Sequence, residues 1–174
     1  MELMEGLLTR RSIRKFQDRP IEKEVLEKII KAAEHAPSAH NTQPWHFLVI
    51  QNKEHLKHFR VMQRSALFAE NAAAVILVCV DKGESFSREK EGWSYQDIDG
   101  SAATMNILLA AHSLGLGACW CGASPMTGPI AAIKEYFELP ENIAPFSIVV
   151  LGYPDETPKE MPRHSTERIH WEKW

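Results

Sequence analysis

The sequence of 174 residues predicts a single layered domain in which helices cover a sheet of few strands. Three observations predict this α/β arrangement. Short apolar runs at residues 47–50, 74–80 and 146–151 have the length and composition of buried strands. Residues 20–36 are apolar at every third or fourth position, with Glu and Lys between, which is typical of a helix lying on a sheet. Residues 99–114 are apolar nearly all round, so this helix is predicted to be central.

The first quarter of the chain predicts two helices and a strand. A short N-terminal helix carries Leu3, Leu7 and Leu8 on one face and is expected to end near residue 10. The amphipathic helix over 20–36 is ended by Pro37, because a residue before proline avoids the helical conformation. The strand at 47–50 follows.

The middle of the chain is expected to alternate between helix and strand. Residues 54–72 are predicted to form one helix, and residues 74–80 a strand that is covered on both faces. Residues 81–93 are polar and are expected to form an irregular excursion. After the central helix, Gly115 and Gly117 end it, one of them in a left-handed conformation.

The last third predicts one more helix, one more strand and a long tail. Gly128 and Pro129 begin a helix that runs to about Phe137, since proline is favoured in a first helical turn. The strand at 146–151 is the last buried element. Residues 153–174 are charged and rich in proline but contain two tryptophans, so this tail is expected to pack against something, for example a second subunit.

Composition narrows the function classes. The net charge of −3 gives no reason to expect nucleic acid as a partner. We expect no membrane span, because no apolar run approaches the roughly 20 residues that a bilayer requires. Three cysteines cannot all pair, which favours a reducing compartment, and we expect the protein to be cytoplasmic.

Two short segments carry the candidate chemistry. The arginine segment, residues 10–14, reads Arg-Arg-Ser-Ile-Arg and combines three guanidinium groups with a hydroxyl, a set that suits a phosphate monoester. Alone, such a cluster is more often a solvated basic patch. The proline loop, residues 37–46, reads Pro-Ser-Ala-His-Asn-Thr-Gln-Pro-Trp-His and offers more hydrogen-bonding groups than a connector needs. Its alternative role is that of a stiff turn.

The patterns of the commonest catalytic classes are missing from the sequence. It contains neither a Gly-x-Ser-x-Gly elbow nor a phosphate-binding loop with Gly-Lys-Ser/Thr, and the glycines at 115–117 end a helix, unlike those of a Rossmann fold. His55 and His58 form an isolated pair, so no metal is predicted. Cys119 and Cys121 lack dithiol spacing and are expected to pack in the core, and Asp97 and Asp99 to cap a helix. A phosphate grip without a nucleophile or an acid–base pair suits an enzyme whose cofactor performs the chemistry.

Four elements in order give the sequence a resemblance to the FMN-dependent nitroreductase family. They are the arginine segment, the Pro-Ser-x-x-Asn-x-Gln-Pro-Trp element at 37–45, the Gly-rich stretch at 115–122, and Arg163 followed by His170 and Trp171. The resemblance covers nearly the whole chain. It implies an α+β fold with a mixed, largely antiparallel sheet flanked by helices, and an intertwined homodimer. It also implies a single domain, 1–174, whose C-terminal arm, 153–174, wraps the partner subunit.

The resemblance also implies which residues bind the cofactor. No side chain is expected to be catalytic, because flavin N5 would be the reactive centre. The residues expected to contact FMN are Arg10, Arg11, Ser12 and Arg14 of the arginine segment, Pro37, Ser38, Ala39 and Asn41 from the partner subunit, Trp120, Cys121 and Gly122 along the ring, and Arg163 over the phosphate. A further contact from the 60s region does not align, and Gln63 or Arg64 could supply it. Ser165 stands where relatives commonly have Lys or Arg, and the stretch from 84 to 96 is short.

The implied function is an oxidoreductase that passes hydride from NAD(P)H through bound FMN to a small organic acceptor such as a nitroaromatic, a quinone or a flavin. The sequence leaves open whether the donor is NADH or NADPH. It also leaves two alternatives: a flavin-binding or flavin-transfer protein with little turnover, and reductive dehalogenation on the same scaffold.

Overall fold

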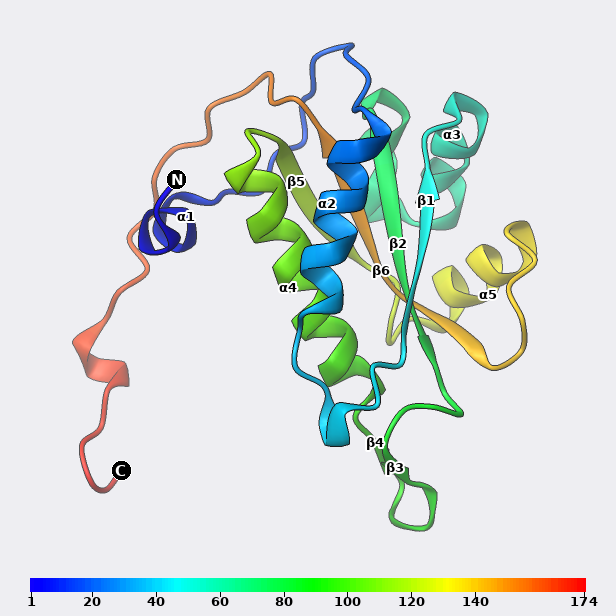
Figure 1. The fold of residues 1–174 in the computed structure, drawn as a ribbon, viewed down its shortest axis with the longest axis vertical. Helices are drawn as coiled ribbons and strands as arrows, with labels where there is room; N and C mark the ends of the chain where they lie inside the picture. Colours follow the sequence, from blue (N-terminus) through cyan, green and yellow to red (C-terminus); the bar gives the residue numbers. More distant parts are fainter.

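Four antiparallel strands form the central sheet in the order β1-β2-β6-β5 (Figure 1). Their bounds are β1 Trp45–Ile50, β2 Ala74–Asp81, β5 Gly117–Gly122 and β6 Ile143–Gly152. The computed structural model describes residues 1–174, apart from the side chain of Glu89. The two inner strands, β2 and β6, are buried along almost their whole length, as their apolar runs predict.

Helices cover both faces of this sheet. Their bounds are α1 Leu3–Thr9, α2 Lys23–Glu34, α3 Lys53–Met62, α4 Gln96–Ser113 and α5 Thr127–Tyr136, with 3₁₀ helices at Ala39–Asn41, Arg64–Asn71, Glu89–Glu91 and Thr166–Arg168. Helices α2 and α4 pack side by side on one face, while α3, the 3₁₀ helix at Arg64–Asn71 and α5 cover the other (Figure 1). None of the helices among the described residues has both the length and the apolar character of a membrane span.

Alternate residues of β2 enter the two halves of the core, because side chains along a strand point to opposite faces. Ile76, Val78 and Val80 pack under α2 and α4, whereas Val75 and Leu77 pack under α3 and α5. The α+β class and the largely antiparallel sheet are therefore confirmed. A parallel component is present as well, in an isolated bridge from the arginine segment to β5.

Three elements differ from the sequence-based prediction. Residues 54–72 are not one helix: α3 ends at Met62, Gln63 is extended, and a 3₁₀ helix follows. The excursion after β2 contains a small hairpin of β3 Ser87–Arg88 and β4 Trp93–Ser94. Strand β5 was not predicted, because its sequence, Gly-Ala-Cys-Trp-Cys-Gly, lacks β-branched residues and becomes a strand only by pairing with β6.

The chain between α1 and α2 runs along the edge of the sheet and is fastened to it at two points. The N–H of Ile13 donates to the carbonyl of Ala118 over 3.0 Å, next to the parallel bridge at Ser12. Further along, Phe16 bridges to the start of the tail at Pro154. These contacts hold the arginine segment beside β5 and the beginning of the tail.

Candidate functional site

In the part of the chain that the structure describes, no carboxylate forms an ion pair with Arg10, and its nearest charged neighbours include two other arginines. Its Nε atom is buried and has no hydrogen-bond partner among the described residues. Burial, together with the neighbouring guanidinium groups of Arg163 and Arg11, lowers the pKa of Arg10. Three cations from the arginine segment and the tail thus repel one another around an orphaned donor. An anion with several oxygens would satisfy the donor and neutralise the repulsion.

The two terminal nitrogens of the Arg11 guanidinium have different surroundings: one bonds to the backbone, and the other has only a weak ion pair. Its Nη1 donates to the carbonyls of Leu8 and Arg10 over 2.7 and 2.8 Å, which satisfies carbonyl groups at the end of α1. Its Nη2 lies 3.8 Å from a carboxylate oxygen of Glu160, a side chain that is 89% exposed. This exposed ion pair is weak, so Nη2 remains available to a stronger anion.

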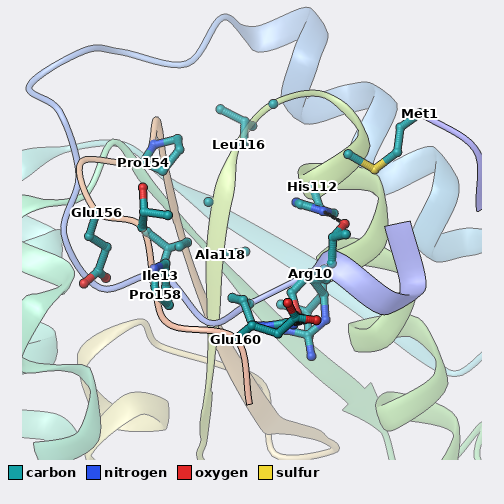
Figure 2. A pocket seen from close by; sticks show the side chains of 16 residues that line it. Met1, Arg10, Ile13, His112, Leu116, Ala118, Pro154, Glu156, Pro158 and Glu160 are labelled. Carbon is teal, nitrogen blue, oxygen red and sulfur yellow. Dashed lines mark hydrogen bonds and ion pairs between the residues drawn. The ribbon is translucent and has the colours of Figure 1, made fainter. Parts of the chain in front are cut away.

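A cavity of about 470 Å³ opens beside the arginine segment (Figure 2). It is bounded by the segment itself, the end of α4, the start of β5 and the first part of the tail. Both Arg10 and Arg11 line it, and so does His112 from the last turn of α4, a residue that no sequence motif singles out. The opposite wall is more apolar and includes Ile13 and Pro158 (Figure 2).

Ser12 and Arg14 face a thiol of β5. The hydrogen bond with Cys121 lowers the pKa of the Cys119 thiol to about 7, and Arg14 and the Ser12 hydroxyl act in the same direction, whereas burial opposes them. The pKa of Cys121 is raised by its contact with Cys119 and by burial. Both thiols are buried, as expected of packing cysteines, and the guanidinium groups of Arg14 and Arg10 favour the ionised form of Cys119.

The end of β5 presents backbone and one large aromatic side chain. The Trp120 indole is 36% exposed and packs edge-on against Phe146, with ring centroids 5.7 Å apart. Cys121 donates from Sγ to the carbonyl of Ser65 over 3.1 Å. The carbonyl of Gly122 accepts a hydrogen bond from the Gln63 amide. Since Gln63 is buried and committed to this contact, Arg64 is the better candidate for a ligand contact from this region.

The proline loop is held in an unusual conformation by its own side chains. His40, Asn41 and Gln43 all have positive φ angles, between 52° and 56°. The Ser38 hydroxyl accepts the backbone N–H of Gln43 over 2.9 Å, and Oδ1 of the Asn41 side chain accepts from Nε2 of the Gln43 side chain over 3.1 Å. Non-glycine residues rarely adopt such angles except where the surroundings impose them, often at functional sites. The conformation therefore supports a binding role over that of a simple turn.

Asp99 fixes this loop to the start of α4. Its Oδ1 accepts the N–H of Ala39 over 2.9 Å, while Oδ2 is buried and has no partner among the described residues. The prediction that Asp97 and Asp99 cap the helix was wrong: both lie inside its first turn, and Asp97 accepts the Ser124 hydroxyl over 2.7 Å. The roles of Asp97 and Asp99 are set by side-chain contacts to loops that are distant in the sequence, and the sequence alone does not reveal such contacts.

Most of the predicted cofactor residues fall into two groups at opposite ends of α4. The remaining three, Trp120, Cys121 and Gly122, lie on β5, whose end approaches the N-terminal end of α4 through the bond from Ser124 to Asp97. The arginine segment, Arg163 and the first residues of β5 gather near the C-terminal end, where His112 bonds to Thr9. Pro37, Ser38, Ala39 and Asn41 lie near the N-terminal end, through Asp99. His112 lies thirteen helical positions after Asp99, a rise of about 20 Å. One chain therefore does not bring the two groups together.

Gly117 allows the arginine segment to approach β5 closely. A Cβ at this position would lie 2.8 Å from Cβ and Cγ2 of Ile13. We expect Gly117→Ala to push the segment off the strand, lower the free energy of unfolding by about 1–3 kcal/mol and weaken ligand binding by the displaced arginines. Gly128→Ala is the matched control, because its Cβ would meet nothing within 4 Å. Chemical denaturation of both variants checks the first effect, and equal stabilities would contradict it.

A separate cluster of possible metal ligands lies at the far ends of β1 and β2. Ligand atoms of His46, Asp81 and Glu84 lie within 4.8 Å of one another, a proximity that their spacing in sequence does not reveal. The Asp81 oxygens accept the N–H of Gly83 and the amide of Asn142, both over 2.7 Å. The cluster is largely exposed, and its hydrogen bonds account for the position of Asp81 without an ion.

Fold and site together define a class: an α+β domain with an antiparallel sheet and a cluster of arginines beside a cavity at its edge. The sequence profile of the Nitroreductase family matches residues 7–84 and 62–153. The chain belongs to this family.

Similar proteins and solved structures match this chain over almost its whole length. A protein of Methanothermobacter thermautotrophicus, named provisionally as an NADH dehydrogenase/NAD(P)H nitroreductase, is 43% identical over 100% of this chain and 88% of its own length. An FMN-dependent nitroreductase of Clostridium difficile has a TM-score of 0.87 at 30% identity, covering 98% of this chain and 99% of its own. A nitroreductase, so named provisionally, from Desulfovibrio desulfuricans was solved in complex with FMN; its TM-score is 0.81 at 26% identity, over 100% and 98% of the two chains.

Proposed function

We propose that this protein is an FMN-dependent oxidoreductase that passes hydride from NAD(P)H to a small organic acceptor. The observation that carries the proposal is the buried, unpaired Nε of Arg10 among three mutually repelling guanidinium groups. The phosphate of FMN supplies the charge and the oxygen atoms that this cluster lacks. Relatives whose names include NAD(P)H nitroreductase and FMN-dependent nitroreductase support the activity.

The residues of the site position a cofactor and tune its charge. Arg10, Arg11 and Arg163 would hold the phosphate, and Ser12 would add a hydroxyl donor. Arg14 would place a positive charge toward the ring, where it favours the anionic, reduced state. Trp120, Cys121 and Gly122 would border the ring with the backbone of β5. The chemistry that FMN supplies when bound is reversible hydride transfer, so no side chain needs to act as nucleophile or general acid.

A homodimer would complete the site. Within one chain the proline loop lies about 20 Å along α4 from the arginine segment. A two-fold axis across α4 would place the N-terminal end of one copy beside the C-terminal end of the other. Pro37, Ser38, Ala39 and Asn41 would then reach the cofactor that the partner's arginine segment holds. Exposed apolar side chains on α1 and α4, including Leu3 at 71% and Ile98 at 59%, support such an interface.

The C-terminal arm, 153–174, is proposed to wrap the partner subunit. It extends away from the body of the chain (Figure 1), and Trp171 and Trp174 are 82% and 100% exposed. Large aromatic side chains left in solvent are typical of surfaces that meet a partner.

We propose that residues 1–174 form a single FMN-binding domain. Three free cysteines support a cytoplasmic location.

The proposal is tested by purifying the protein and mixing it anaerobically with NADH or NADPH. We expect bound FMN with an absorbance that bleaches on addition of a nicotinamide and returns with a nitroaromatic or quinone acceptor. Protein that binds no FMN would overturn the proposal. Bound flavin that neither nicotinamide reduces would indicate a flavin carrier instead, and loss of halide from a halogenated ring would indicate a dehalogenase.

A further inference from the structure

His112 shares the cavity of Arg10 and Arg11 but has no part in the function described so far (Figure 2). We infer that His112 is a proton-dependent ligand of the FMN phosphate, which makes cofactor affinity depend on pH. This inference rests on the proposed function. It adds a residue to the phosphate site and states how that residue is regulated.

Hydrogen bonds fix the imidazole and its tautomer. The Thr9 hydroxyl donates to the carbonyl of Glu5 over 2.7 Å, so its oxygen must accept from the His112 ring, whose Nε2 lies 2.9 Å away. The neutral ring therefore carries its proton on Nε2. Nδ1 is then the atom that can gain a second proton, and the charged ring gains a donor there for a phosphate oxygen.

The surroundings of His112 disfavour its protonated form in the absence of an anion. Burial has the largest effect and lowers the pKa of His112. The guanidinium groups of Arg10 and Arg11 lower it further, while the carboxylate of Glu5 in α1 raises it. The C-terminal end of α4 also favours a cation at this position. Burial and the two arginines outweigh the carboxylate of Glu5, so the pKa of His112 is lowered.

Two carboxylates line the same cavity, and neither takes the place of a phosphate. Glu156 accepts the backbone N–H groups of Arg14 and Lys15, and these bonds lower its pKa. Glu160 is exposed and meets Arg11 only at 3.8 Å. A phosphate entering the cavity would therefore act mainly on the arginines and on His112.

Phosphate binding reverses the balance at His112. A dianion offsets the two arginines, so the pKa of His112 rises and the ring takes up a proton when FMN binds. As the pH falls through the raised pKa of His112 in the FMN complex, the wild-type protein gains affinity for FMN. A variant with an uncharged side chain at position 112 does not gain affinity in this way. The second ionisation of the FMN phosphate also falls near pH 6. For the unbound cofactor this ionisation is the same in both experiments, so its contribution cancels in the ratio of the two dissociation constants.

The experiment compares wild type, His112→Gln and the control His58→Gln, a change on the exposed surface of α3. Dissociation constants for FMN and riboflavin are measured by flavin fluorescence between about pH 5.5 and 8. We expect His112→Gln to bind FMN about five- to tenfold more weakly than wild type at the low end and less than about twofold more weakly at the high end. Riboflavin, which lacks the phosphate, should bind both proteins equally, and His58→Gln should match wild type.

The outcomes separate this inference from the proposed function. An affinity ratio that does not change with pH, or an equal loss for riboflavin, would overturn the role of His112 while leaving the FMN enzyme intact. If wild type bound no FMN, inorganic phosphate becomes the probe, followed by the imidazole NMR signals of His112. A rise in its pKa with phosphate supports the anion site, and an unchanged pKa overturns it.

Discussion

Arg10→Ala weakens FMN binding by about 10- to 150-fold. The expected loss is that of one charge-assisted hydrogen bond, about 1.5–3 kcal/mol. Arg10 is the residue to change because its Nε is buried and unpaired and because its guanidinium adjoins that of Arg163. Removing it also relieves the repulsion in the ligand-free protein, so the fold should be no less stable. Flavin fluorescence titration measures the affinity, and thermal unfolding measures the stability.

Three comparisons make this result specific. Arg60→Ala removes an exposed arginine of α3 that pairs with Glu70 and does not line the cavity, and it should leave FMN binding unchanged. Arg10→Lys keeps the charge but loses the planar guanidinium, so its affinity for FMN should fall between those of wild type and Arg10→Ala. Riboflavin should bind Arg10→Ala as well as it binds wild type. Unchanged FMN affinity in Arg10→Ala would show that the phosphate lies elsewhere.

The sheet was predictable from the sequence where a strand is buried on both faces. Strand β2 shows a continuous apolar run because both of its neighbours and both helical layers exclude water from it. The opposite case is β5, whose side chains include a half-exposed Trp120 and small residues that let other groups approach. Its extended shape comes from the ladder with β6, a contact that local pattern does not encode.

The break within residues 54–72 has a similar cause. Helical spacing of apolar residues continues through this segment, but Gln63 leaves the helix to place its amide on the Gly122 carbonyl. A polar side chain that bonds to a distant strand can end a helix while the apolar periodicity of the sequence continues past it. Sequence periodicity therefore predicts the existence of such helices better than their ends.

The candidate site was predictable in its residue types but not in its geometry. Three arginines in five residues indicate an anion, and the proline loop indicates a ligand contact. His112 could not be selected, because it stands in an apolar helix with no motif around it, and only the packing of α1 against α4 brings it to Arg10. Contacts between distant segments decide which side chains share a site.

Mixing two variants that each bind FMN weakly should restore tight flavin sites if each site is built from two chains. Arg10→Ala damages the arginine half. Asn41→Asp damages the loop half by removing the amide donor, while Asp still accepts from Gln43 and tolerates the positive φ of this position. In a mixed dimer both changes fall in one site and the other site is intact. Random pairing of equal amounts should therefore restore about a quarter of the wild-type sites.

The number of restored sites discriminates between the possible arrangements. If one chain supplied all contacts, every site in the mixture would carry one of the two changes and none would recover. Mixed dimers isolated through two different tags should hold one tightly bound FMN per dimer, half of the wild-type content, and neither parent should hold any under the same conditions. A protein that sediments as a monomer would contradict the arrangement directly. Because α4 keeps its two ends about 20 Å apart, recovery in the mixed dimer requires that the loop of one subunit reaches the arginines of the other.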